Sequence, residues 1–382
     1  MEKQQKFSKI CLIYFISLLC FTLVRVASSL GAFNVFSETV ADAVFTVIVQ
    51  LFIMGVLPFM LYILIYKKQK INKQSIKESF NDIGFKKLSF KSVLIAIILG
   101  VCVYVFNILI ASFFDMILAL FGYEGGASAG TQPSTSIWYL MFSLFITAVM
   151  PGVFEEVLHR GILQKGVRDA KNFKWVLLCS GLFFGLMHLN INQFFYATII
   201  GIFFAYIAYI TNNIWPSIIL HFMNNAINVF LNFTNRNNGI GEKFYATLNN
   251  FLQNNNMALI MLCVTCIMLV LSVVSAFLVV ALYNDNNKSN KIYLRLLTPQ
   301  FMKNYLALKR NSEINTDQIG LNYSQFVSRE NDVIPAEQDL CSMFNIKNEK
   351  SEKLSFRYSI FFYATLLLGG LITIFTFIWG IL

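Results

Sequence analysis

Charged residues are scarce in this chain, and that scarcity excludes most classes of soluble protein. Asp, Glu, Lys and Arg make up only 13% of the 382 residues, whereas hydrophobic residues make up 57%. A typical soluble domain carries about 25% charged residues. We therefore expect an all-α protein of the cell membrane, a polytopic bundle of transmembrane helices with a small cytoplasmic segment.

The sequence also lacks the features of a nucleic-acid-binding or disulfide-stabilised protein. The net charge of +10 is modest for the length, and no basic face with interleaved aromatic residues is present, so we expect no nucleic-acid partner. Six of the seven cysteines lie in apolar runs, where Cys packs as a small hydrophobic residue. Cys263 and Cys266 have the spacing of a metal or redox pair, but no second pair accompanies them, and we interpret them as structural.

Nine apolar stretches are long enough to cross a membrane, which takes about 20 residues in a helix. They are roughly 10–30, 43–66, 93–121, 137–163, 174–190, 193–211, 214–235, 257–283 and 358–382. Lys3, Lys6 and Lys9 precede the first stretch, as in a signal peptide, but no clean small-x-small cleavage site follows it. We therefore predict a retained anchor and about nine spans.

Lysine residues gather in alternate loops between these stretches. The loop after the second stretch carries eight lysines within residues 67–91 against two acidic residues, and the loop after the fourth carries four basic residues within 165–174 against one acidic residue. Basic residues favour the cytoplasmic side of a membrane. The pattern predicts a cytoplasmic N-terminus and an external C-terminus, and leaves the oligomeric state open.

The chain divides into five predicted parts, and we detect no internal repeat. They are 1–92 with two spans and a basic loop, 93–235 as the core, 236–283 with an external loop and a further span, 284–357 as a polar cytoplasmic segment, and 358–382 as a C-terminal span. The polar segment fits a helix lying on the membrane surface, a small soluble subdomain or a linker.

Two adjacent carboxylates, Glu155 and Glu156, lie inside the fourth apolar stretch. A charged group at such depth costs several kcal/mol unless it is paired or hydrated, so it points to function. Arg160 follows Glu156 by four residues on the same helix face, which predicts an ion pair. Glu155 is turned away from Glu156 by about 100° and is expected to face a cavity.

Two further polar clusters lie on later apolar stretches. Phe184 and His188 share one helix face, because they are four residues apart. His221 and Asn225 share a face for the same reason. Two other asparagines on this helix, Asn224 and Asn228, are alternatives to Asn225.

The three clusters are expected at similar depths in the inner half of the membrane. With a rise of about 1.5 Å per residue, Glu155, His188 and His221 come within about 10 Å of one another in depth. A carboxylate in such a place suits a general base acting on water, and imidazole and amide donors suit a developing oxyanion. The clusters therefore predict a hydrolytic site.

The clusters also resemble the motifs of a membrane protease family. Glu155-Glu156-Val-Leu-His159-Arg160, Phe184-Gly-Leu-Met-His188 and His221-Phe-Met-Asn-Asn225 are similar to the Glu-Glu-x-x-x-Arg, Phe-x-x-x-His and His-x-x-x-Asn motifs of the CPBP (Abi) family. That family comprises CAAX-processing intramembrane endopeptidases and bacteriocin-processing relatives. The resemblance covers roughly residues 93–235, which we interpret as a CPBP-like intramembrane protease core.

The resemblance implies hydrolysis of peptide bonds near the membrane and a role for each motif residue. Glu155 and His188 would activate a water, His221 and Asn225 would hold that water or stabilise the oxyanion, and Glu156 and Arg160 would form a structural pair. The implied partners are a peptide or protein substrate and the lipid bilayer. We expect the cavity to open towards the cytoplasmic side.

The same residues leave open whether the site uses a metal ion. Glu155, His188 and His221 are acceptable ligands of a catalytic zinc, but a metal-free mechanism fits them as well, and we favour it. His159 stands where the family usually has an aromatic residue. We interpret it as a wall residue with local hydrogen bonds, with an accessory role as ligand or proton carrier as the alternative. Phe184 is a second accessory residue.

Two other functions remain open at this point. A non-catalytic membrane regulator or adaptor, acting in bacteriocin immunity or signalling, would use the same scaffold and tolerate replacement of Glu155. A proton-coupled transporter would use a buried carboxylate, but no inverted repeat or pair of broken helices is evident. For a protease, bacteriocin processing, self-immunity and cleavage of a regulatory membrane protein are the candidate roles.

Overall fold

The computed structural model describes residues 2–124, 135–171, 173–286 and 356–381, and every regular element in these ranges is helical. The predicted all-α fold is confirmed. Most of the predicted polar segment 284–357 lies outside the described residues.

Two long rods combine α-helical and π-helical stretches. The first is Glu38–Tyr66, with α2 (Glu38–Val47), η1 (Ile48–Val56), α3 (Leu57–Leu61) and η2 (Tyr62–Tyr66). The second is Ile137–Ala170, with α6 (Ile137–Leu144), η3 (Phe145–Val149), α7 (Met150–Glu156), η4 (Val157–Leu163) and α8 (Gln164–Ala170). The other helices are α1 (Glu2–Ser29), α4 (Lys73–Asp82), α5 (Phe90–Leu120), α9 (Phe173–Met187), α10 (Ile191–Thr211), α11 (Trp215–Arg236), α12 (Ile240–Asn254), α13 (Met257–Asn286) and α17 (Phe356–Trp379).

Local side-chain chemistry sets several helix ends. Ser89 begins α5 by accepting a hydrogen bond from the backbone N–H of Ser92, and Asn190 begins α10 in the same way through Asn192. Such caps satisfy backbone donors that a helix leaves free at its start. Between α9 and α10, Leu189 adopts a left-handed conformation with φ of 50°, so the chain reverses within three residues.

Seven helices among the described residues are long and apolar enough to cross a membrane. They are Glu2–Ser29, Glu38–Tyr66, Phe90–Leu120, Ile137–Ala170, Ile191–Thr211, Ala258–Asn286 and Arg357–Trp379. The protein is therefore a multi-pass membrane protein, but the expected count of nine spans is not confirmed. α9 has only 15 residues because the turn at Leu189 ends it. α11 is less apolar because one of its faces carries His221 and several asparagines.

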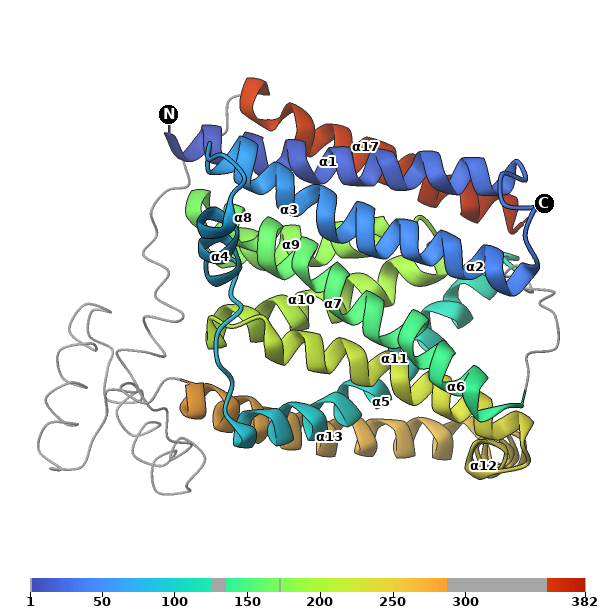
Figure 1. Cartoon of the computed structure of the whole chain (residues 1–382). Coiled ribbons are helices and arrows are strands. Elements are labelled where there is room, and N and C mark those ends of the chain that lie inside the picture. The colour runs from blue at the N-terminus through green and yellow to red at the C-terminus, as the bar shows by residue number, and fades with distance from the viewer. Residues whose placement is uncertain (1, 125–134, 172, 287–355, 382) are drawn as a thin grey trace, which may run out of the picture.

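The helices lie side by side, with α1 and α17 on one side of the bundle and α5 and α13 on the other (Figure 1). The rod Ile137–Ala170 lies between them with α9, α10 and α11. α4 and the lysine-rich loop lie at one end of the bundle, here called the lysine end, and α12 lies across the opposite end, here called the α12 end. α5 and α11 run from the lysine end to the α12 end.

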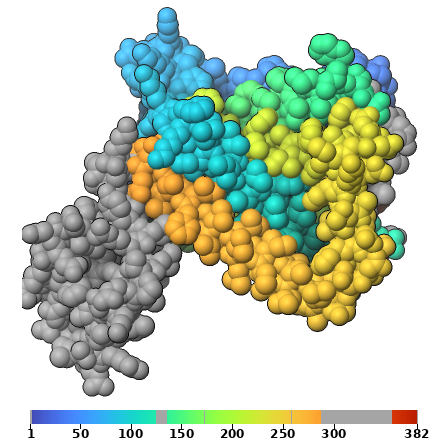
Figure 2. Space-filling view, turned by 90° about the horizontal axis from the view of Figure 1, so that it is seen from below, coloured from blue at the N-terminus to red at the C-terminus, as the bar shows by residue number. Residues whose placement is uncertain are grey.

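α13 covers the side of α5 that faces away from the rest of the bundle, and Figure 2 shows it along that face, with α12 at its end. Only 11% of the apolar window of α13 is buried inside the protein. Most of this helix is therefore left for contact with lipid, as expected at the edge of a membrane bundle.

α9 and α10 pack closely because small residues lie between them. A Cβ atom on Gly185 would lie 2.6 Å from the carbonyl oxygen of Phe194, and one on Gly181 would lie 2.8 Å from the carbonyl oxygen of Thr198. Only glycine allows backbones to approach so closely in a membrane. This packing fixes the end of α9, where His188 follows.

Candidate active site

The two adjacent glutamates lie on α7, a short α-helical stretch between two π-helical ones. η3 precedes it and η4 follows it, and Pro151 in its first turn cannot donate a backbone hydrogen bond. π-helical stretches inside helices occur frequently at functional sites. The rod is therefore locally irregular where its four ionisable motif residues lie.

Glu155 is held at one oxygen and faces His221 with the other. Its Oε1 accepts a 2.8 Å hydrogen bond from Nε2 of Gln50, on η1. Its Oε2 lies 3.9 Å from Nε2 of His221, on α11. This distance is too long for a direct hydrogen bond. Glu155 is 9% exposed, so one oxygen is oriented by the protein and the other is left beside an imidazole.

Glu156 makes the ion pair that its spacing from Arg160 predicts. Its Oε1 accepts a 2.8 Å hydrogen bond from a terminal nitrogen of Arg160 and a 2.9 Å hydrogen bond from Nδ1 of His221. Neither side chain of the ion pair is exposed. Glu156 therefore binds Nδ1 of His221 and fixes the orientation of this ring, whose Nε2 faces Glu155.

Phe184 lies at the centre of the cluster. The Arg160 guanidinium lies 4.4 Å from the centre of its ring, a cation–π distance. The rings of His159, His188 and His221 all lie edge-on to it, at centroid distances of 5.0, 5.0 and 5.6 Å. Arg160 also donates to the carbonyl of Gly201 on α10. The aromatic ring thus separates the three histidines at fixed distances.

His188 is positioned by main-chain contacts. Its Nδ1 donates to the carbonyl of Phe184 over 2.9 Å, because a carbonyl oxygen can only accept. Its own carbonyl accepts a 2.8 Å hydrogen bond from Arg25 on α1. The ring therefore presents Nε2, as an acceptor in the neutral form, towards the remaining space.

A chain of amides connects α5 to α11 and to the second rod. Asn107 donates to Asn224 over 3.0 Å, Asn224 donates to Asn225 over 3.2 Å, and Nδ2 of Asn225 donates to the carbonyl of Thr147 over 3.1 Å. Each of these residues borders the same cavity. Nδ2 of Asn225 carries a second hydrogen, which remains available on this wall.

One cavity of about 630 Å³ joins these groups. Its lining includes Glu155, Phe184, His188, His221, Asn224, Asn225 and Asn228 from the sequence-predicted set, together with residues of α5 and α10. Glu156, His159 and Arg160 are buried but do not line it. The structure therefore brings the predicted Glu155, His188, His221 and Asn225 around one space.

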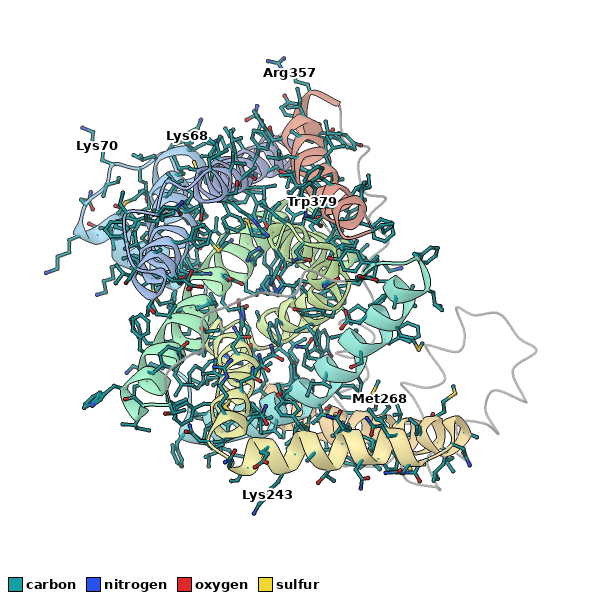
Figure 3. All side chains as sticks on the ribbon, turned by 90° about the vertical axis from the view of Figure 1, so that its right-hand side faces the viewer. Lys68, Lys70, Lys243, Met268, Arg357 and Trp379 are labelled. Atoms are coloured by element: carbon teal, nitrogen blue, oxygen red, sulfur yellow. The ribbon has the colours of Figure 1, made fainter. Side chains whose placement is uncertain are left out.

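The cavity is closed at the lysine end and opens towards the α12 end. On α5 it extends from Tyr104 to Asp115, in the direction of the α12 end. Its buried part includes His221, which is 5% exposed, whereas Thr147, Asp115 and Asn228 are exposed. In Figure 3, seen from the α12 end, Lys243 of α12 points away from the bundle.

If the lysine end is cytoplasmic, as its lysines predict, the opening does not lie on the expected cytoplasmic side. The backbone N–H of Ile214 donates to the carbonyl of Gly84 over 2.9 Å, and the Asn213 side chain donates to the carbonyl of Lys86. These contacts bind the lysine-rich loop to the start of α11 and cover that end. Counting helical rise does not show on which side the chain covers the site.

Comparison with known proteins finds a family model that is similar to the part of the chain with the motif residues. Residues 137–227 match the family model described as Type II CAAX prenyl endopeptidase Rce1-like. This match confirms the resemblance of the motifs to CAAX-type membrane proteases. Residues 137–227 are therefore called the CPBP segment below, and they include every motif residue from Glu155 to Asn225.

A curated relative of the CPBP segment comes from Bacillus subtilis (strain 168) and is named "Putative membrane peptidase YdiL". The two proteins are 26% identical over 88 residues, which is 23% of this chain and 36% of that relative. The match thus spans little more than a third of the relative's length. No solved structure matches the chain.

His159, the residue by which the CPBP segment departs from the family pattern, lies away from the cavity. Its Nδ1 donates to the carbonyl of Glu155 over 2.7 Å, and its Nε2 lies 2.9 Å from the hydroxyl of Tyr14 on α1. The Tyr14 hydroxyl also lies 2.7 Å from the carbonyl of Phe183. His159 is fully buried, so this arrangement favours the interpretation as a locally hydrogen-bonded residue.

Glu155, His188 and His221 are the residues considered from the sequence as zinc ligands. Among the described residues, no group of three His, Cys, Asp or Glu side chains is placed to hold a metal ion. Glu155 shares one oxygen with Gln50, and the Nδ1 of His221 is bonded to Glu156. These contacts leave Oε2 of Glu155 and Nε2 of His221 free, and the chemistry proposed below is written with residues of the chain alone.

Three residues that contact the site were missed as site residues by sequence reasoning. They are Tyr14, Arg25 and Gln50, which bond to His159, His188 and Glu155 respectively. Gln50 is an amide within an otherwise apolar span, and Arg25 is a charge near the end of another. Isolated polar residues in membrane spans therefore were a usable signal, but they do not reveal their partners.

Proposed function

We propose that the protein is an intramembrane endopeptidase that hydrolyses peptide bonds with a water held between Glu155 and His221. The observation that carries the proposal is the 3.9 Å between Glu155 Oε2 and His221 Nε2 beside the cavity. Two atoms at this separation can both lie about 2.8 Å from one water oxygen. The family of the CPBP segment supports the same reaction class.

The hydrogen bonds around His221 support its role as the acceptor of a hydrogen bond from the water. Its Nδ1 donates to Glu156, so the neutral ring has a lone pair on Nε2. Glu155 Oε2 is also an acceptor, and together the two atoms can accept both hydrogens of one water. The lone pairs of that water would face the cavity. This geometry favours His221, rather than His188, as the partner of Glu155.

The reaction then follows ordinary general-base chemistry. The water oxygen bonds to the carbonyl carbon of the substrate while its proton moves to Glu155. The second Nδ2 hydrogen of Asn225 is free to donate to the oxyanion, and His188 offers Nε2 to the bound peptide. The proton then moves from Glu155 to the leaving nitrogen as the carbon–nitrogen bond breaks.

The size and direction of the cavity suggest the kind of substrate. A volume of about 630 Å³ lies within the range of sites for small ligands and short peptide segments. With the predicted cytoplasmic N-terminus, the α12 end lies on the external side, so membrane-associated or exported peptides would enter there. Bacteriocin processing and self-immunity are two roles that such a protease would serve.

Comparative peptidomics tests this function. Cells carrying the wild-type protein are compared with cells carrying Glu155→Gln, and peptides are measured in the membrane and in the medium. Glu124→Gln, an exposed carboxylate outside the cavity lining, is the matched control. We expect product peptides with the wild type and the control but not with Glu155→Gln. Identical peptide sets in all three would support a non-catalytic regulator or adaptor instead.

A further inference from the structure

The charges along the cavity have one sign. Its lining contains the carboxylates of Glu155 and Asp115 and, among the described residues, neither lysine nor arginine. Glu155 is at the buried end, whereas Asp115 is at the exposed end on α5. Lys243 on α12 points away from the bundle (Figure 3). The entrance is therefore electrostatically negative.

Asp115 is an unusual residue in its helix. It is the only acidic or basic residue between Lys91 and Glu124, and no hydrogen bond or salt bridge joins it to another described residue. Its neighbours Phe113 and Met116 are 53% and 56% exposed, as on a helix side that meets lipid. A carboxylate in such a run is costly, and charges of this kind mark the paths of substrates.

The distance from Asp115 to the proposed water can be counted along two parallel helices. The hydrogen bond from Asn107 to Asn224 sets these residues at one level. From there Asp115 lies eight residues towards the α12 end and His221 three residues towards the lysine end, about 12 and 4.5 Å. Asp115 and His221 are therefore about 16 Å apart along the helices, which about five residues of extended chain would span.

The wall between these two points offers further acceptors. The Oδ1 atoms of Asn107 and Asn192 are buried and have no hydrogen-bond partner among the described residues. Both residues line the cavity. Buried amide oxygens are normally bonded, so a rotation of either side chain towards the cavity would let its oxygen accept from an extended peptide or a cationic side chain.

We propose that Asp115 determines specificity by binding a lysine or arginine of the substrate about five residues from the cleaved bond. The proposal rests on the protease function proposed above and names the substrate class as basic peptides. Asp115 contacts the substrate far from the reacting atoms, so its loss changes substrate preference and not the chemical step.

Peptide mixtures test this proposal with the purified full-length protein. Internally quenched mixtures have one position fixed as Lys, Gln or Glu and the others randomised, and cleavage is measured for the wild type, Asp115→Asn, Asp115→Lys and the control Glu124→Gln. Binding of the same mixtures, carrying a fluorescent label, is measured by anisotropy. For a partly exposed ion pair we expect the wild type and the control to prefer the Lys mixture over the Glu mixture by about two- to fivefold.

The variants separate the possible outcomes. Asp115→Asn should abolish the preference, and Asp115→Lys should reverse it. A wild type without charge preference, or a preference that Asp115→Asn leaves unchanged, would overturn the proposal while leaving the protease function intact. If no mixture is cleaved, the protease function fails, and the binding measurement still decides whether Asp115 selects basic peptides.

Discussion

The CPBP segment and the N-terminal part of the chain contribute to the site in different ways. The CPBP segment supplies Glu155, His188 and His221 to the cavity lining, whereas no residue of 2–66 lines the cavity. The N-terminal part instead places Gln50 on Glu155 and Arg25 on the carbonyl of His188, behind the cavity wall. The motif residues thus include the groups that line the cavity, while groups from other helices hold them in place.

Replacing Glu155 should have the largest effect. Glu155→Gln keeps the shape of the side chain and its place beside Gln50 but removes the base, so we expect a loss of about 10²- to 10⁴-fold in kcat. The thermal unfolding midpoint should change little. Cleavage by the purified protein in liposomes measures this, and a variant with wild-type kcat would remove Glu155 from the chemistry.

Breaking the buried ion pair should lower the free energy of unfolding more than any of the other substitutions. Arg160→Met leaves Glu156 buried with His221 as its remaining partner, at a cost of about 3–5 kcal/mol. The matched control is Lys165→Met on the same rod, whose pair with Asp169 has side chains 28% and 26% exposed and should be worth at most about 1 kcal/mol. If the two variants lowered the thermal unfolding midpoint equally, the buried pair would stabilise the protein no more than the exposed one.

Replacing Gln50 tests whether a residue of the N-terminal part positions Glu155. Gln50→Leu removes the hydrogen bond that orients Glu155, and we expect a loss of about 10- to 100-fold in kcat with KM unchanged, because a bond to a charged group is worth about 1.5–3 kcal/mol. Gln164→Leu is the control, since this buried amide donates to the carbonyl of Ala205 and does not line the cavity. It should lower stability but not kcat. If both variants lost kcat equally, Gln50 would have no specific role in positioning.

Tyr14 should give the smallest effect. Tyr14→Phe removes the hydroxyl shared by His159 and the carbonyl of Phe183, which should lower the unfolding free energy by about 0.5–1.5 kcal/mol. Its control, Tyr66→Phe, loses a hydrogen bond to Asp169. The two variants should differ only in kcat, which Tyr14→Phe lowers slightly through the Glu155 carbonyl that His159 holds. A kcat loss as large as that of Glu155→Gln would make His159 part of the chemistry.

The sequence predicted the parts of the site that depend on spacing along one helix. Four-residue spacing predicted the Glu156–Arg160 pair, and scarce charge predicted the helical membrane fold. It could not predict that Gln50 meets Glu155, because the two are 105 positions apart and only the packing of separate rods joins them. The count of nine spans is not confirmed, because α9 is short and the polar face of α11 towards the cavity makes that helix less apolar.

The pH dependence of cleavage tests most directly whether Glu155 activates the water in its ionised form. Purified full-length protein in liposomes is assayed from neutral to acidic pH, together with Glu155→Gln. We expect the wild-type kcat to fall by about tenfold per pH unit on the acid side as one carboxylate is protonated. The residual rate of Glu155→Gln should lack this fall. A wild-type rate that stays flat over the whole acid range would contradict it.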